Sequence, residues 1–205
     1  MDAKELIKQA KEYEEQGKKD KAYIYYLEAA LAEDDGEAVY KLAQMYLRGE
    51  YVNEDFEKSA HYFEMAYERG YDLPSWLFVF IGGSYESGIE YCPQNPETAM
   101  KWYKMAADRG VDYAYACIGE LYYEGKGVKQ DLDKAYELFV KSGEKETMPL
   151  YYLGLMHELG QVVSQDTEKA KEYYLEIVNE HRQAGEHGDL HYQLAEKRLA
   201  GLGGR

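Results

Sequence analysis

AYACIGELYYEGKGVKQDLDKAYELFVKSG, residues 114–143, contains two amphipathic helical patterns separated by a short glycine-containing stretch. In the second pattern, Ala135, Phe139 and Ser142 have the spacing that places side chains on one face of an α-helix. Gly143 follows at a position where such a helix ends. The stretch therefore predicts a hairpin of two helices joined by a turn.

Both helical patterns recur along the chain. The second has counterparts in DFEKSAHYFEMAYERG (55–70), NPETAMKWYKMAADRG (95–110) and DTEKAKEYYLEIV (166–178). The first has counterparts in residues 38–49, 77–88 and 149–160, and each ends in glycine. Six positions before that glycine lies a small residue, which is Ala43, Gly82, Gly119 or Gly154. Because glycine inside a helix costs about 1 kcal/mol relative to alanine, its recurrence predicts that a neighbouring helix approaches closely there.

The repeat length predicts the architecture. The small residue of the second helix falls at Ala22, Ser59, Ala99, Ala135 and Ala170, at intervals of 35 to 40 residues. Such a period is typical of a solenoid of helix pairs. We therefore predict an all-α fold, a right-handed alpha-alpha superhelix of about five helix–turn–helix repeats in a single domain over residues 1–205. The predicted elements are repeats at 3–34, 36–70, 73–110, 112–143 and 146–180, a loop over 181–188 and a capping helix over 189–201.

The fourth hairpin resembles the Sel-one-like repeat family, a branch of the tetratricopeptide-like helical repeats. The residues that carry this resemblance are Ala114, Ile118, Gly119, Tyr122, Gly125, Gly127, Val128, Asp131, Lys134 and Ala135. The resemblance implies a scaffold or adaptor that binds other proteins or peptides, and it names no partner. Some secreted members have a disulfide in each repeat, and this chain departs from them because its only cysteines are Cys92 and Cys117.

Charge and composition narrow the classes of partner. The chain has a formal net charge of −15, which disfavours nucleic acid and anionic membrane surfaces and favours a basic protein or peptide. Its first residues are too polar for a signal peptide, and no stretch approaches the roughly 20 apolar residues that a membrane span requires. With two cysteines as reduced thiols, we expect a cytoplasmic protein. A monomer is favoured, although the sequence leaves the oligomeric state open.

In helical repeat arrays of this kind the first helix of each pair lines the concave face. The positions of that helix not assigned to packing predict a partner-binding groove. Its residues are Tyr40, Gln44, Leu47, Trp76, Val79, Glu86, Tyr113, Glu120, Tyr123, Tyr151, Leu155 and Glu158. Carboxylates would bind Lys or Arg, and aromatic rings would pack on side-chain stems or under a cation. The alternative for any single tyrosine is that it fills space between helices.

The sequence predicts no catalytic residue, metal site or cofactor. Gly125-Lys126-Gly127 matches the turn positions of the other repeats, whereas a phosphate loop needs a preceding strand and a longer glycine pattern. His181, His187 and His191 lack the pattern of a zinc-binding helix and are expected at the surface of the cap. Two alternatives stay open: a small-molecule-binding or hydrolytic enzyme that uses the concave carboxylates, and a structural protein that self-assembles by end-to-end stacking.

Overall fold

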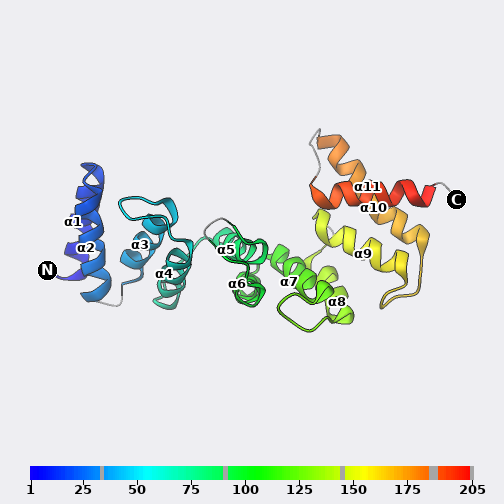
Figure 1. Cartoon of the computed structure of the whole chain (residues 1–205), viewed down its shortest axis with the longest axis horizontal. Coiled ribbons are helices and arrows are strands. Elements are labelled where there is room, and N and C mark those ends of the chain that lie inside the picture. The colour runs from blue at the N-terminus through cyan, green and yellow to red at the C-terminus, as the bar shows by residue number, and fades with distance from the viewer. Residues whose placement is uncertain (33–34, 90–91, 144–145, 185–188, 204–205) are drawn as a thin grey trace. The chain divides into compact units, whose positions relative to one another are not determined.

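The computed structural model describes residues 1–32, 35–89, 92–143, 146–184 and 189–203, without the side chains of residues 183, 184 and 203. Within these residues the chain forms eleven α-helices (Figure 1). They are α1 (Ala3–Glu15), α2 (Lys19–Ala32), α3 (Gly36–Arg48), α4 (Phe56–Glu68), α5 (Ser75–Ser87), α6 (Pro96–Asp108), α7 (Asp112–Glu124), α8 (Leu132–Ser142), α9 (Thr147–Leu159), α10 (Thr167–Ala184) and α11 (Leu190–Gly203). The predicted all-α fold is confirmed.

The helices belong to two compact units, Met1–Gln94 and Asn95–Arg205. In the first unit, α1 pairs with α2 and α3 with α4. In the second, α7 pairs with α8 and α9 with α10, and α11 packs on α9 and α10. The predicted helix–turn–helix pairing is thereby confirmed, while the single domain and the right-handed superhelix stay predictions.

Two glycines inside the first helices, Gly119 and Gly154, lie where a large side chain of the second helix crosses them. A Cβ added to Gly119 would lie 2.9 Å from Cε1 of Phe139, and one added to Gly154 would lie 2.7 Å from Cε1 of Tyr174. Phe139 and Tyr174 are fully buried. The predicted close approach is therefore confirmed at both positions, and an aromatic ring fills the space that a side chain would need.

A polar variant of this crossing occurs in the first unit. Ser59 takes the place of the alanine found in the other repeats, and its hydroxyl donates to the carbonyl oxygen of Ala43 at 2.8 Å. Ser59 is buried, so this hydrogen bond satisfies a hydroxyl that would otherwise be costly to bury.

The Gly125-Lys126-Gly127 stretch is the turn between α7 and α8. Gly125 has φ +70°, and the N–H groups of Gly125 and Lys126 both donate to the carbonyl of Leu121. A Cβ on Gly127 would lie 2.8 Å from Cβ of Pro96, at the start of α6. Protein atoms thus fill the space beside the glycine, and the predicted inter-helix turn is confirmed.

A glutamine closes this turn, and the same closure recurs in the chain. Gln130 donates from Nε2 to the carbonyl of Tyr123 near the end of α7, at 2.8 Å. Gln94 and Gln165 make the equivalent bonds to the carbonyls of Glu86 and Glu158, at 2.8 and 2.9 Å. The residue after each of these glutamines is the N-cap of the next helix, where Asn95, Asp131 and Asp166 accept from backbone N–H groups. Neighbouring residues therefore cap the end of one helix and the start of the next.

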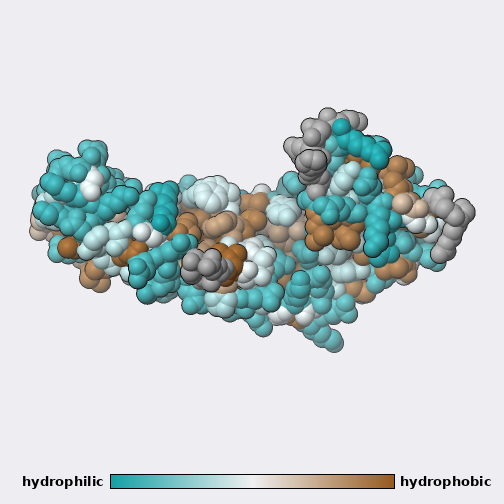
Figure 2. Space-filling view, turned by 45° about the horizontal axis from the view of Figure 1, so that its top comes forward, coloured by the Kyte–Doolittle hydropathy of each residue, from teal (hydrophilic) through white to brown (hydrophobic). Residues whose placement is uncertain are grey.

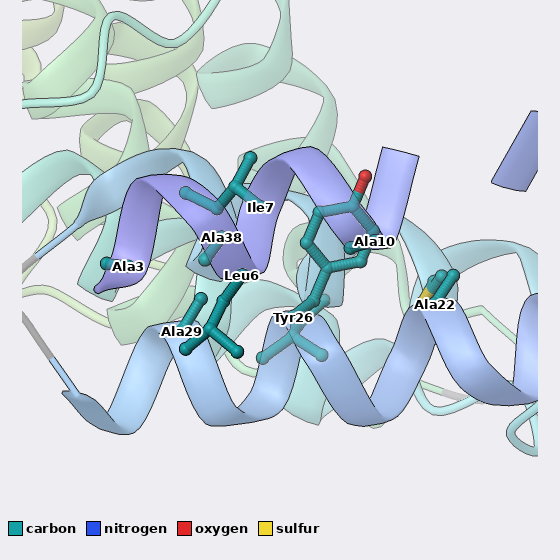
Figure 3. Close-up of a cluster of buried hydrophobic side chains, with 10 residues drawn as sticks. Ala3, Leu6, Ile7, Ala10, Ala22, Tyr26, Ala29 and Ala38 are labelled. Carbon is teal, nitrogen blue, oxygen red and sulfur yellow. The ribbon is translucent and has the colours of Figure 1, made fainter. Parts of the chain in front are cut away.

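The core of the first two helices is drawn in Figure 3. Tyr26 of α2 is fully buried within a cluster that includes Leu6 and Ala10 of α1. Its hydroxyl donates to Oε2 of Glu14 at 2.8 Å, and Lys41 of α3 lies 3.3 Å from the same oxygen. The buried ring thus carries a polar tip that links the first pair of helices to the second.

The predicted loop over 181–188 is wrong for its first four residues, because α10 continues to Ala184. His181 lies one helical turn after Ile177, with its Nδ1 3.1 Å from that carbonyl, and its ring packs at 4.9 Å from that of Tyr192. This packing against α11 supports the extra turn. Residues 185–188, His187 among them, lie outside the described residues, and α11 ends two residues later than the predicted capping helix.

Candidate functional site

In the first unit, the predicted groove residues of α3 are partly engaged with their own neighbours. Tyr40 is half-buried and stacks on Tyr71, with ring centroids 4.7 Å apart. Gln44 donates to the Tyr40 hydroxyl at 3.0 Å, and Leu47 is half-buried. These side chains are accessible in part, and their contacts hold them in place.

The predicted residues of α5 include the most exposed aromatic side chain of the set. Trp76 is 63% exposed and lies against Phe80, which is 43% exposed, with centroids 6.2 Å apart. Phe80 in turn packs edge-on to the buried Phe56 at 6.1 Å. Val79 and Glu86 on the same helix are half-buried. We call Trp76 and Phe80 the α5 aromatic pair, which is open to solvent on one side and supported by the core on the other.

In the second unit, the predicted residues Tyr113 and Tyr123 of α7 are half-buried, and burial raises the pKa of both hydroxyls. Tyr123 donates to Oε1 of Gln161 at 3.0 Å. Tyr151 and Leu155 of α9 are each only 6% exposed. In this arrangement the two α9 residues are not accessible to a partner.

Glu120 of α7 is held by a tyrosine from the next repeat. Tyr152 donates to Oε1 of Glu120 at 2.9 Å, and its ring stacks nearly parallel on Phe139 with centroids 4.8 Å apart. The Glu120 side chain is 16% exposed. Burial raises the pKa of this carboxyl, and the hydrogen bond from Tyr152 lowers it by less.

Glu158 of α9 joins three helices. Its Oε2 accepts from the hydroxyl of Tyr174 on α10 at 2.9 Å, and its Oε1 lies 3.1 Å from Nη1 of Arg198 on α11. The Glu158 side chain is 16% exposed, whereas that of Arg198 is 39% exposed. This carboxylate therefore already binds a cation of the same chain, and its predicted contact with a partner stays a prediction.

His191 of α11 lies between two rings of α9 and near a carboxylate of α7. Its ring centroid is 5.5 Å from that of Tyr151 and 5.6 Å from that of Tyr152. Its Nε2 is 4.0 Å from Oε1 of Glu120, too far for a hydrogen bond. Burial lowers the pKa of His191 and outweighs the opposite effect of Asp189 and Glu124.

The burial of His191 predicts a pH dependence. Because its folded-state pKa lies below the ordinary 6.5, the unfolded chain takes up a proton first as the pH falls, so stability is lost below about 6.5. The raised pKa of Glu120 acts in the opposite sense, since the penalty of its buried charge is relieved in acid. We expect His191→Gln to lose less stability than the parent between pH 7 and pH 5, measured by urea unfolding. Parallel pH profiles of the two proteins would contradict this assignment.

Sequence reasoning missed three residues of these surfaces, which are Phe80, Tyr152 and Arg198. It also expected His191 at the surface of the cap, and this is wrong, because the side chain is only 14% exposed and packs against two rings of α9. Phe80 and Tyr152 share one register position, eight before the closing glycine, so the repeat alignment held a signal for both. His191 and Arg198 belong to the predicted cap, whose contacts depend on tertiary packing that the repeat pattern does not contain.

The described residues contain neither a metal-binding cluster nor a helix suited to span a membrane. No cluster of three or more His, Cys, Asp or Glu side chains in them could hold a metal ion. None of their helices is long and apolar enough to cross a membrane. Cys92 and Cys117 are both buried and free of disulfides.

Paired helices with a 35–40-residue period and with glycines at their crossings define a helical repeat protein. The family profile described as "Sel1 repeat" matches residues 15–34, 36–71, 80–111, 113–146 and 150–177. The chain belongs to the Sel1 repeat family, as the resemblance implied. Repeats of this family typically mediate protein interactions and are generally non-catalytic.

Several known proteins are similar to this chain. The ERAD-associated E3 ubiquitin-protein ligase component HRD3A of Arabidopsis thaliana is 30% identical over 120 residues, which are 56% of this chain and 18% of that protein. The protein NMB1327 of Neisseria meningitidis is 28% identical over 176 residues, 82% of this chain and 33% of that one. The chain therefore spans between about a fifth and a third of these relatives.

Solved structures share the fold. A Sel1 repeat protein from Oxalobacter formigenes has a TM-score of 0.51 and 28% identity, with 84% of this chain and 71% of that one covered. The protective antigen c5321 of uropathogenic Escherichia coli has a TM-score of 0.66 and 22% identity, with 98% and 41% covered. The latter likeness concerns the fold alone.

Proposed function

We propose that this protein is a scaffold or adaptor that binds a protein or peptide segment rather than a catalyst. The observation that carries the proposal is the α5 aromatic pair, in which Trp76 is 63% exposed beside a partly exposed Phe80. A large exposed aromatic that is supported from behind is typical of an interface hot spot. The face in Figure 2 is mostly hydrophilic, with hydrophobic residues at the surface in separate patches.

The preferred ligand is a segment that combines a cation with an aromatic or aliphatic side chain. The net charge of −15 attracts basic segments and repels nucleic acid and anionic lipid. The exposed rings of the α5 aromatic pair can pack on the side-chain stems of Lys or Arg or lie beneath their charge. We place the protein in the cytoplasm, because its two cysteines are buried and outside any disulfide, as suits a reducing compartment. We also propose that it is a monomer.

An array of peptides with varied basic, aromatic and aliphatic content tests this function. We expect the protein to bind basic segments, with an affinity that falls as salt is added. We expect Trp76→Ala to weaken this binding roughly 30-fold, because a central hot-spot aromatic contributes about 2 kcal/mol. Leu31→Ala is the matched control, since Leu31 is a 79%-exposed apolar residue of the same unit. Equal binding by parent and Trp76→Ala would overturn the role of α5.

Two other functions remain as competing outcomes. Turnover of a small molecule that is lost on neutralising Glu86, Glu120 and Glu158 would favour the enzyme alternative. Concentration-dependent oligomers that are disrupted by substitutions on the outer face of α11 would favour self-assembly.

A further inference from the structure

Helix α11 occupies the surface of the second unit on which a partner was expected. His191 lies beside Glu120, and Arg198 binds Glu158. Both carboxylates are among the predicted groove residues, and so is Tyr151, whose ring packs near His191. The predicted site therefore already contains a cationic, helical segment of the chain itself.

Helix α11 approaches one more repeat than the next helix of a regular array would. In a solenoid each repeat contacts its immediate neighbours, so a helix that merely continued the array would meet α9 and α10. Helix α11 packs on both of these (Figure 1), and His191 also comes within 4.0 Å of Glu120 on α7, one repeat further back. It thus lies along the surface formed by successive first helices.

One face of α11 makes these contacts. His191, Leu194, Ala195 and Arg198 have i, i+3, i+4 and i+7 spacing, which is how an amphipathic helix docks in a groove. Ala195 is fully buried, and Leu194 and Arg198 line a cleft of about 490 Å³ together with Tyr151 and Glu158. The docking face therefore presents a histidine at its N-terminal end, a cation at its C-terminal end, and apolar side chains between them.

The packing of α11 is weaker than that of its neighbours. Among its described side chains, Ala195 is the single buried hydrophobic residue. Every other helix of the second unit buries three or more residues. Because apolar burial supplies most of the free energy that holds a helix in place, α11 is the helix of this unit that leaves most easily.

We propose that Glu120, Tyr151 and Glu158 form a binding site for an amphipathic helix of a protein partner, and that α11 is a tethered occupant which the partner helix displaces. The partner helix carries a cation that binds Glu158. One turn before this cation it carries small or aliphatic residues, and two turns before it a histidine or a second cation. The proposal deepens the proposed function and rests on it for the existence of a partner.

A synthetic peptide of residues 189–203 with a fluorescent label tests the site directly. In the parent protein the tethered copy competes at an effective concentration in the millimolar range, so we expect weak binding. Arg198→Glu places a carboxylate beside Glu158 and releases α11. We expect this variant to bind the peptide roughly tenfold or more tightly than the parent does.

Two controls accompany this comparison. Ala200→Glu adds a carboxylate at an exposed position of α11 that does not line this cleft, and the variant should bind the peptide as weakly as the parent. A peptide that carries the Arg198→Glu substitution should not bind the opened site. If Ala200→Glu tightens binding as much as Arg198→Glu does, or if the altered peptide binds as well as the original, the proposed contact with Glu158 is wrong.

A measurement on the unaltered protein covers the case in which the variant does not fold. Saturating free peptide should increase hydrogen exchange of the α11 amides while α7 and α9 stay protected. Unchanged exchange of α11 at saturation would overturn the proposal. Neither experiment involves Trp76, so the failure of this site and the failure of the α5 aromatic pair are separate results.

Discussion

Gly119→Leu is expected to destabilise the second unit by about 3 kcal/mol, at the upper end of the range for overpacked cores. A Cβ at this position would already lie 2.9 Å from the ring of Phe139. That ring is fully buried and stacked on Tyr152, with centroids 4.8 Å apart, so it has no free space to move into. Urea unfolding followed by circular dichroism measures the loss.

Gly201→Ala is the matched control for this substitution. Gly201 is also helical, and a Cβ there meets no heavy atom within 4 Å. Alanine should therefore leave stability unchanged or raise it slightly through helix propensity, whereas Gly119→Ala should lower it. If both glycines tolerate alanine equally well, the ring of Phe139 does not enforce the glycine at 119.

Tyr26→Ala is expected to destabilise the first unit by about 3–5 kcal/mol, the range for truncating a buried aromatic. The ring is fully buried in the cluster around Leu6 and Ala10, and its hydroxyl donates to Glu14. Truncation leaves a cavity and removes one of the two donors to Oε2 of Glu14, the other being Lys41. Thermal and urea unfolding of the whole chain, with hydrogen exchange of α1 and α2, measure the effect.

Two further variants separate the contributions of Tyr26. Tyr26→Phe keeps the ring and removes the hydroxyl, so it should cost about 1 kcal/mol. Ile24→Ala, on the same helix at a 48%-exposed position, should change stability by less than about 0.5 kcal/mol. An equal loss from Ile24→Ala and Tyr26→Ala would mean that the cluster is not the core of this unit.

The sequence predicts the helix pairs well because their signals are local and repeated. The spacing of apolar residues, the glycines that end helices and the small residues at crossings recur in register, and several copies reduce the ambiguity of any single one. Gly119 illustrates this, since its predicted close contact is made by Phe139 of the same hairpin.

The candidate site is less predictable because helical periodicity identifies a face but not what covers it. Tyr151 and Leu155 share the predicted groove face with Trp76, yet the first two are buried and the third is largely exposed. The difference for Tyr151 depends on α11, whose contacts with Glu120 and Glu158 link residues far apart in the chain. No pattern within one repeat encodes such contacts.

The glutamine closure of the turns has a consequence for the duplication of hairpins during evolution. Gln94, Gln130 and Gln165 each bond a carbonyl of the helix just before them, and the next residue caps the helix just after. Since the turn inside each of these hairpins satisfies its own backbone groups, a copied gene segment that encodes one hairpin carries a complete turn with it. The internal turn of an added hairpin therefore needs no partner from the neighbouring hairpins to satisfy these polar groups.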